Sequence, residues 1–124
     1  RPLPAPEPPG HSLARRGGPS RVPKPPGHLA PAGRALWRSV VREYVLEGHH
    51  RAVLQAACEA SDRLTEARAA IERDGAYIEG RFGLKAHPGL GIERDSRTGM
   101  LRALRELGLD LEAPATSRPP PRWR

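Results

Sequence analysis

The sequence predicts a mainly α-helical protein, in which an antiparallel helical hairpin, a small β-hairpin and a third helix are flanked by disordered arms rich in proline and arginine. Three observations lead to this prediction. Proline is concentrated at the two ends of the 124-residue chain. Apolar residues recur at helical spacing through most of the middle. One short segment near residue 80 changes to a period of two, which is typical of strands.

Proline separates the ends of the chain from its middle. Nine of the 15 prolines lie in residues 1–30 and four more lie in residues 113–124. Proline lacks the backbone donor and its ring clashes within a helix, and segments of this composition bury too little apolar surface to offset their chain entropy. We therefore expect a disordered basic arm at 1–28, a folded domain at 29–112 and a disordered basic tail at 113–124.

A first helix is predicted from Pro31 to Gly48. Proline is tolerated in the first turn of a helix, and glycine is a common residue just beyond the last turn. The apolar side chains between them fall on one wide face, as expected for a helix that packs on a core. The members of this face are Leu36, Trp37, Val40, Val41, Tyr44 and Val45.

A longer second helix is predicted over residues 49–74, followed by Gly75. A tight turn at 48–50 would set it antiparallel to the first helix. Its apolar stripe advances in alternating steps of four and three, which is the pattern of a heptad seam. Half of the stripe is alanine, so a second helix could approach closely, and we assign the stripe to an oligomer interface. Its members are Val53, Ala57, Ala60, Leu64, Ala67 and Ile71.

A β-hairpin is predicted within residues 76–86. Phe82, Leu84 and Ala86 fall on one side of an alternating pattern. Gly80-Arg81 fits a two-residue turn with glycine first. Because two strands alone are marginally stable in water, this hairpin is expected to pack on a helix or on a neighbouring subunit.

A third helix is predicted over residues 90–108, and Gly108 ends it. Leucines near its carboxyl end supply an apolar side, and four arginines lie mainly on the other side. A folded unit of this size has a small core, and cores of fewer than about 70–80 residues rarely contribute more than 3–5 kcal/mol. With a single cysteine the chain has no intrachain disulfide. Oligomerisation is therefore the expected source of further stability.

The net charge of +7 is confined to the two ends of the chain. Residues 31–112 contain 13 basic and 13 acidic residues, whereas the ends contain all of the excess arginine and lysine. Such arms are either solubilising linkers or a sequence-independent means of binding phosphate. We assign to DNA binding the basic residues of the arms and of the third helix. They are Arg15, Arg16, Arg21, Lys24, Arg94, Arg97, Arg102, Arg105, Arg118, Arg122 and Arg124.

The sequence contains no recognisable catalytic constellation. Cys58 lies among alanines within the second predicted helix, where we expect a buried and inert thiol. His49 and His50 are adjacent, so they do not share a helix face, and we expect no metal and no cofactor. No apolar run approaches the roughly 20 residues needed to cross a bilayer. These observations favour a non-enzymatic protein that does not enter a membrane.

The order of four segments resembles a known family. A proline-rich entry to the first helix (PKPPGHLAPAGRALWRSVV) is followed by a long Ala/Glu/Arg helix (AACEASDRLTEARAAIERDG). A hairpin that ends in KAHPG comes next, and then IERDSRTGMLRALRELGLDL. In this order and spacing, over about residues 22–112, the chain resembles the small terminase subunits of siphophages and prophages.

The resemblance implies a role in packaging viral DNA. Proteins of that family hold the phage genome, assemble into rings and hand DNA to a large subunit that contains the ATPase and the nuclease. The expected partners are therefore double-stranded DNA, the terminase large subunit and further copies of the chain, in the cytoplasm of a bacterial host. Two alternatives remain at this point: a helical protein–protein interaction module, and a small DNA-binding regulator.

Overall fold

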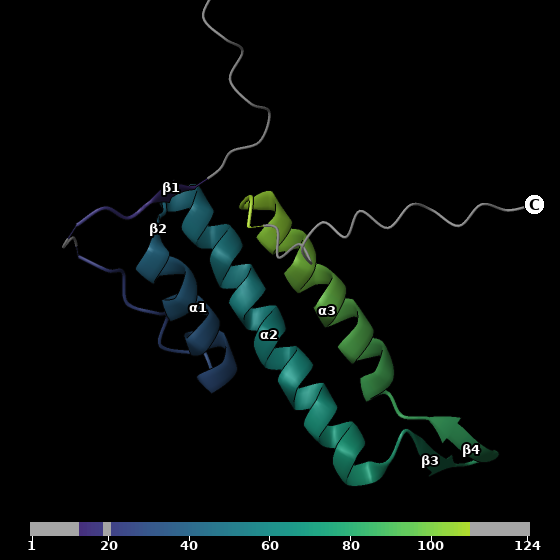
Figure 1. Ribbon diagram of the computed structural model, residues 1–124. Coiled ribbons are helices and arrows are strands. Elements are labelled where there is room, and N and C mark those ends of the chain that lie inside the picture. Colours follow the sequence, from purple (N-terminus) through teal and green to yellow (C-terminus); the bar gives the residue numbers. More distant parts are fainter. Residues whose placement is uncertain (1–12, 19–20, 110–124) are drawn as a thin grey trace, which may run out of the picture.

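The computed structural model describes residues 13–18 and 21–109, and it is mainly helical, as the sequence predicts (Figure 1). The described part has three helices and two pairs of short antiparallel strands. In chain order the elements are β1 (Ala14–Arg15), α1 (Pro31–Glu43), β2 (Tyr44–Val45), α2 (Gly48–Asp74), β3 (Tyr77–Gly80), β4 (Gly83–Ala86) and α3 (Gly89–Glu106).

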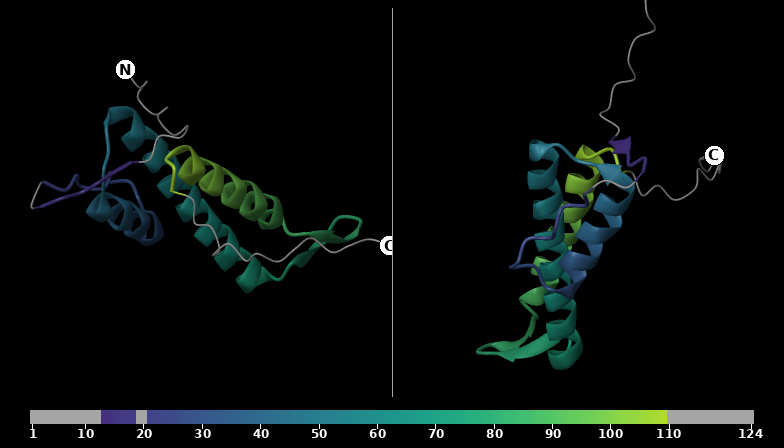
Figure 2. Two further views of the ribbon diagram at one scale, coloured as in Figure 1. Left: turned by 45° about the horizontal axis from the view of Figure 1, so that its top comes forward. Right: turned by 90° about the vertical axis from the view of Figure 1, so that its left-hand side faces the viewer.

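The long helix α2 is the centre of the fold. It contacts α1 along its amino-terminal half and α3 along its other side, and each neighbour runs antiparallel to it (Figures 1 and 2). The predicted helical hairpin of α1 and α2 is therefore present. Since α3 also returns along α2, the three helices form one layered bundle without a sheet between them.

The core lies where the amino-terminal segment, α1, the first half of α2 and the end of α3 meet. Trp37 and Val41 supply the inner face of α1, and Leu54 and Cys58 supply the facing side of α2. Leu107 closes the cluster from the end of α3. Buried members of the cluster are Leu13, Leu29, Trp37, Val40, Val41, Leu46, Leu54, Cys58 and Leu107.

Helix α1 is shorter than predicted. It ends at Glu43 instead of residue 48, and Tyr44 adopts an extended backbone with φ −126° and ψ 148°. Tyr44 and Val45 then pair with Arg15 and Ala14 as β2 and β1. Gly48, which was predicted to end the first helix, is the first residue of α2. The sequence did not indicate this end because the pairing strand lies about 30 residues upstream, in the proline-rich segment.

The described part of the expected arm packs against the helices. Leu13 is only 7% exposed and belongs to the core. The indole Nε1 of Trp37 donates a hydrogen bond to the carbonyl oxygen of Pro23 at 3.0 Å, and His28 Nε2 lies 2.8 Å from Glu59 Oε2 on α2. Residues 13–18 and 21–28 thus extend the folded unit beyond the boundary expected at residue 29, while the predicted tail at 113–124 lies outside the described residues.

The predicted β-hairpin is present, but its turn is displaced by one residue. Gly80 pairs with Gly83, so Arg81 and Phe82 form the turn in place of Gly80 and Arg81. Gly83 has a φ of +115°, a conformation that side-chain-bearing residues rarely adopt. Gly83 meets this requirement at the first position of β4, and the register itself is defined by the strand pairing. As a result Phe82 lies at the tip of the hairpin instead of on a strand, and it is 96% exposed.

The hairpin projects beyond the ends of α2 and α3 (Figure 2). Every residue of β4 is exposed, and Leu84 and Tyr77 are 75% and 69% exposed. Of the two alternatives expected for the hairpin, packing on a helix of the same chain is not seen among the described residues, and packing on a neighbouring subunit stays a prediction.

His87 joins the end of α2 to the beginning of α3. Its Nε2 lies 3.0 Å from Asp74 Oδ2, and its Nδ1 accepts a hydrogen bond from the backbone N–H of Gly89 at 2.8 Å. Because Nδ1 accepts, the proton of the neutral ring resides on Nε2 and points at the carboxylate. Helix α3 starts one residue earlier than predicted and ends at Glu106, and Gly108 follows with a φ of +75°.

Candidate nucleic-acid interface

The four arginines of α3 all lie on its outer side. All four are exposed, and at 100° per residue they occupy about 140° of the helix circumference; Arg97, at one edge of this arc, lies about 20° from the buried Leu104. Two of them are near acids: Arg94 Nε is 3.4 Å from Asp95 Oδ1 and Arg97 Nη1 is 3.9 Å from Glu93 Oε1. Arg102 and Arg105 have no ion-pair partner within residues 13–18 and 21–109. The helix therefore presents two uncompensated positive charges in its last two turns.

The basic residues of the amino-terminal segment divide into two groups. Arg15, Arg21 and Lys24 are exposed. Arg16 is half-buried, and its guanidinium donates to the carbonyl oxygens of Val41 at 2.9 Å, Tyr44 at 3.3 Å and Arg21 at 3.4 Å. Arg16 thus connects this segment to the end of α1. The structure assigns it a structural contact in addition to any contact with phosphate.

Arg21 and Lys24 border a pocket that sequence reasoning did not identify. Its volume is about 510 Å³, and its described lining residues are Arg21, Val22, Pro23, Lys24 and Arg51. Arg51 lies at the end of the first turn of α2, some 30 residues away in sequence. An arginine in the first turn of a helix is itself unusual, because the helix dipole favours acids rather than cations at that end. No sequence rule, however, places Arg51 beside residues 21–24.

Three of the predicted DNA-binding residues, Arg118, Arg122 and Arg124, lie outside the part of the chain that the structure describes. The remaining eight fall on two separate surfaces. One is the outer side of α3, and the other is the amino-terminal segment beside α1 and the start of α2 (Figure 1). The structure therefore does not gather the predicted residues into one patch.

The predicted oligomer seam is largely used within the chain. Ala57, Leu64 and Ala67 are buried, and Val53, Ala60 and Ile71 are half-buried. Near its carboxyl end the seam faces α3: Ala67 lines the same pocket as Ile92, and a Cβ atom on Gly89 would lie 3.2 Å from Ile71 Cγ1. This part of the seam, at Ala67 and Ile71, is therefore covered by α3 of the same chain.

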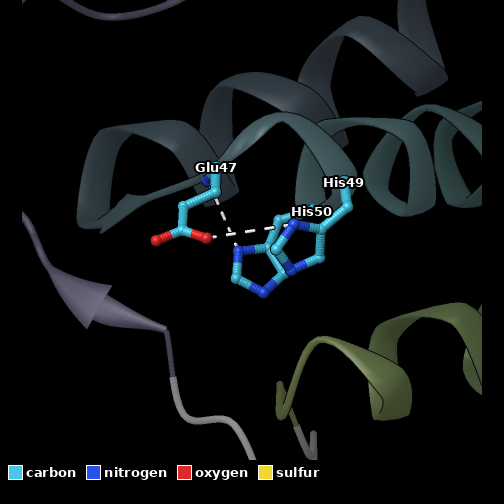
Figure 3. A group of neighbouring side chains, drawn as sticks. All are labelled: Glu47, His49 and His50. Atoms are coloured by element: carbon cyan, nitrogen blue, oxygen red, sulfur yellow. Dashed lines mark hydrogen bonds and ion pairs between the residues drawn. The ribbon is translucent and has the colours of Figure 1, made fainter.

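One group of side chains offers three metal-ligating atoms within 4.8 Å of one another: Glu47, His49 and His50 (Figure 3). His49 Nδ1 is 3.9 Å from Glu47 Oε2, while His50 Nδ1 accepts the backbone N–H of Glu47 at 3.4 Å. Glu47 in turn accepts the backbone N–H of His50, which completes a capping box at the start of α2. The positive end of the helix dipole disfavours a cation here, so we assign the group to helix capping.

Cys58 is buried on the side of α2 that faces α1. Burial raises the pKa of its thiol to about 12, and the negative charges of Asp62 and Glu59 add to the effect. A thiolate is the nucleophilic form of cysteine. The prediction of a buried thiol is confirmed, and the environment of Cys58 opposes nucleophilic chemistry.

These features define a small helical protein with outward-facing cations and a projecting apolar hairpin. Within the described residues, no helix is both long and apolar enough to cross a membrane. The model of the family described as phage terminase, small subunit, matches residues 33–121, which is most of the chain. The chain belongs to this family. No curated protein and no solved structure matches it.

Proposed function

We propose that this chain is the oligomeric, non-enzymatic DNA-binding factor of a phage or prophage packaging machine. In this role it presents double-stranded viral DNA to the large terminase subunit in the cytoplasm of the host cell. The observation that carries the proposal is the family match over residues 33–121. The outward-facing cations, the inert Cys58 and the exposed hairpin support its separate parts.

DNA would be held through phosphate contacts from the cations on α3 and on the amino-terminal segment. Arg102 and Arg105 are exposed and have no ion-pair partner among the described residues. Contacts to phosphate position a protein on DNA without reading its sequence. Selection of a packaging site would then come from DNA bending or from a few base contacts.

The DNA proposal is tested by fluorescence anisotropy of a labelled duplex over a range of salt concentrations. Replacing both Arg102 and Arg105 by Gln should flatten the log–log salt slope by about 1.8, at about 0.9 per phosphate contact. The matched control replaces Arg68 and Arg73, which lie 3.9 Å and 3.0 Å from the acids Glu93 and Asp74. Equal slopes for both double variants would remove α3 from the DNA surface, and an unbound wild type would overturn DNA binding altogether.

Oligomerisation would use the exposed apolar hairpin. Tyr77, Phe82 and Leu84 are exposed, and a two-stranded hairpin is marginally stable on its own. Repeated head-to-tail contacts close into a ring where the rotation allows it. Native mass spectrometry at low micromolar concentration should show one species of many protomers; a persistent monomer would argue against the ring.

The same hairpin also supports a second candidate function, in which the chain is an adaptor that binds another protein. In that case the cations serve solubility, and the protein is not retained on duplex DNA at low salt. Salt-dependent retention on a duplex favours the packaging factor, and its absence together with a discrete protein partner favours the adaptor.

A further inference from the structure

We propose that Arg21, Lys24 and Arg51 form a binding pocket for a phosphate group. The three cations border one pocket of about 510 Å³, together with the apolar Val22 and Pro23. If the bound phosphate belongs to a DNA backbone, this inference rests on the proposed DNA-binding function. Binding of inorganic phosphate to the pocket can be tested without that function.

Uncompensated charge marks the pocket. None of its described lining residues is acidic. Within residues 13–18 and 21–109, none of the three cations has an ion-pair partner at 4.0 Å or less. Three like charges around one cavity repel one another, so a bound anion would stabilise the arrangement. An anion is therefore the ligand class that the pocket fits.

The location of Arg51 adds to this argument. It stands at the end of the first turn of α2, where the capping residue Glu47 is the nearest acid in the chain but forms no ion pair with it, and the helix dipole disfavours a cation at that end. The same dipole favours an anion, and it would act in concert with the arginine once a phosphate is bound.

The segment that supplies the other two cations is held in place at several points. Arg16 Nη1 donates to the carbonyl oxygen of Arg21 at 3.4 Å, while its Nε and Nη2 bind carbonyl oxygens at the end of α1. Trp37 Nε1 donates to the carbonyl oxygen of Pro23 at 3.0 Å. Both backbone anchors lie within the lining segment 21–24, so the backbone that presents the two side chains is ordered before a ligand arrives.

The chemistry of the side chains points to phosphate in particular. Arginine offers a planar fork of donors that matches the oxygens of a phosphate, and lysine adds a compact point charge. The phosphate could be a backbone group of a nucleic acid or a free phosphate ion. These two sources share the chemistry but differ in how binding depends on salt and on chain length.

The test compares the full chain with Arg51→Gln and with Arg63→Gln. Arg63 is exposed on the same helix, twelve residues further along, or about 18 Å at 1.5 Å per residue. Both substitutions remove one charge from an exposed position of α2, so they alter the net charge of the protein equally. Arg51→Lys keeps the charge and should restore most of the binding.

Two measurements are made on each variant. Inorganic phosphate is titrated against backbone and arginine side-chain NMR signals, and a labelled duplex is bound at several salt concentrations. We expect Arg51→Gln to flatten the salt slope for the duplex by about 0.9, as for one lost phosphate contact, and Arg63→Gln to leave it unchanged. Phosphate should shift the signals of Arg21 and Arg51 in the wild type, and in Arg51→Gln the signals of Arg21 should no longer shift.

The outcomes separate the two phosphate sources and the two proposals. An effect of Arg51→Gln on the duplex assigns the pocket to the nucleic-acid backbone. Loss of inorganic phosphate binding alone supports the pocket with a free anion as its ligand. Identical behaviour of Arg51→Gln and Arg63→Gln in both assays overturns the pocket even where the duplex binds. If the wild-type protein does not bind the duplex, the proposed DNA-binding function is wrong. The titration with inorganic phosphate then still tests whether the pocket binds phosphate.

Discussion

The carboxylate of Asp62, on α2, accepts a hydrogen bond from the backbone N–H of Gly33, on α1, at 2.6 Å. Its second oxygen accepts the N–H of Ala30 at 2.8 Å. Helix α1 has no side-chain cap of its own, because Ala30 occupies the capping position. Asp62 therefore supplies from another helix the acceptor that an N-cap residue ordinarily provides. This single side chain fixes the start of α1 against α2.

Replacing Asp62 by Ala should destabilise the protein by about 1–3 kcal/mol, because it leaves two backbone donors without an acceptor. Asn keeps one acceptor oxygen and should cost less. Urea denaturation measures the free energy of unfolding, and Glu72→Ala, an exposed acid on the same helix, is the control. Equal midpoints for Asp62→Ala and the control would show that the interhelical cap does not contribute.

Gly33→Ala should be destabilising by a different route. A Cβ atom at this position would lie 2.6 Å from Asp62 Oδ2 and 2.8 Å from the carbonyl oxygen of Cys58. The backbone of Cys58 cannot yield without moving α2, and overpacking of this kind costs about 1–3 kcal/mol. The control is Gly99→Ala on α3, where no atom lies within 4 Å and where alanine should stabilise the helix. A neutral or stabilising Gly33→Ala would contradict the close approach of α1 and α2.

Stability should fall as the solution is acidified, with Asp74 contributing to the loss. Hydrogen bonds from Arg73 and then from His87 lower the pKa of Asp74 from 3.8 to about 2. Because the folded pKa is the lower one, the contribution is complete above about pH 5 and is lost progressively as the pH falls to about 2 and below. Asp74→Asn should flatten the curve of unfolding free energy in that window. Urea denaturation between pH 2 and pH 5 measures this curve. If Asp74→Asn and the wild type show the same slope of unfolding free energy against pH, that result would count against the contacts of Asp74.

Cys58 should resist thiol reagents in the native protein. Its pKa of about 12 leaves almost no thiolate at pH 8, and the side chain is buried. We expect no reaction with a disulfide reagent until urea unfolds the chain, followed by labelling of one thiol per chain. Rapid labelling without denaturant would mean that the α1–α2 interface opens readily.

Phe82→Ser should change assembly rather than the fold. The side chain is 96% exposed at the hairpin tip. Its loss should therefore alter the unfolding free energy of one chain by less than about 0.5 kcal/mol. If the hairpin docks on another copy, native mass spectrometry should show a smaller assembly, whereas the exposed control Thr98→Ala keeps the wild-type mass. An unaltered mass for Phe82→Ser would move the oligomer interface elsewhere.

Local sequence signals were sufficient for the helices and for the existence of the hairpin. The helical period, together with Pro31 before it and Gly75 after it, correctly predicted where α1 begins and where α2 ends. These signals work because the helical period and the proline or glycine at a helix end act locally, although the cap of α1 comes from the distant Asp62. The hairpin turn was misplaced by one residue, since Gly80 and Gly83 both suit a turn and only strand pairing decides between them.

What the sequence by itself determined is the three helices, the existence of the β3–β4 hairpin, the inert surroundings of Cys58 and a family resemblance borne out over residues 33–121, whereas β1 and β2 were not predicted. Only the tertiary structure decided which elements meet. It ended α1 at Glu43 by pairing Tyr44 with Arg15, and it set the carboxyl-terminal part of the α2 seam, at Ala67 and Ile71, against α3. It also brought Arg51 to residues 21–24. Contacts between distant segments depend on the packing of the whole chain, and neither periodicity nor composition encodes that packing locally.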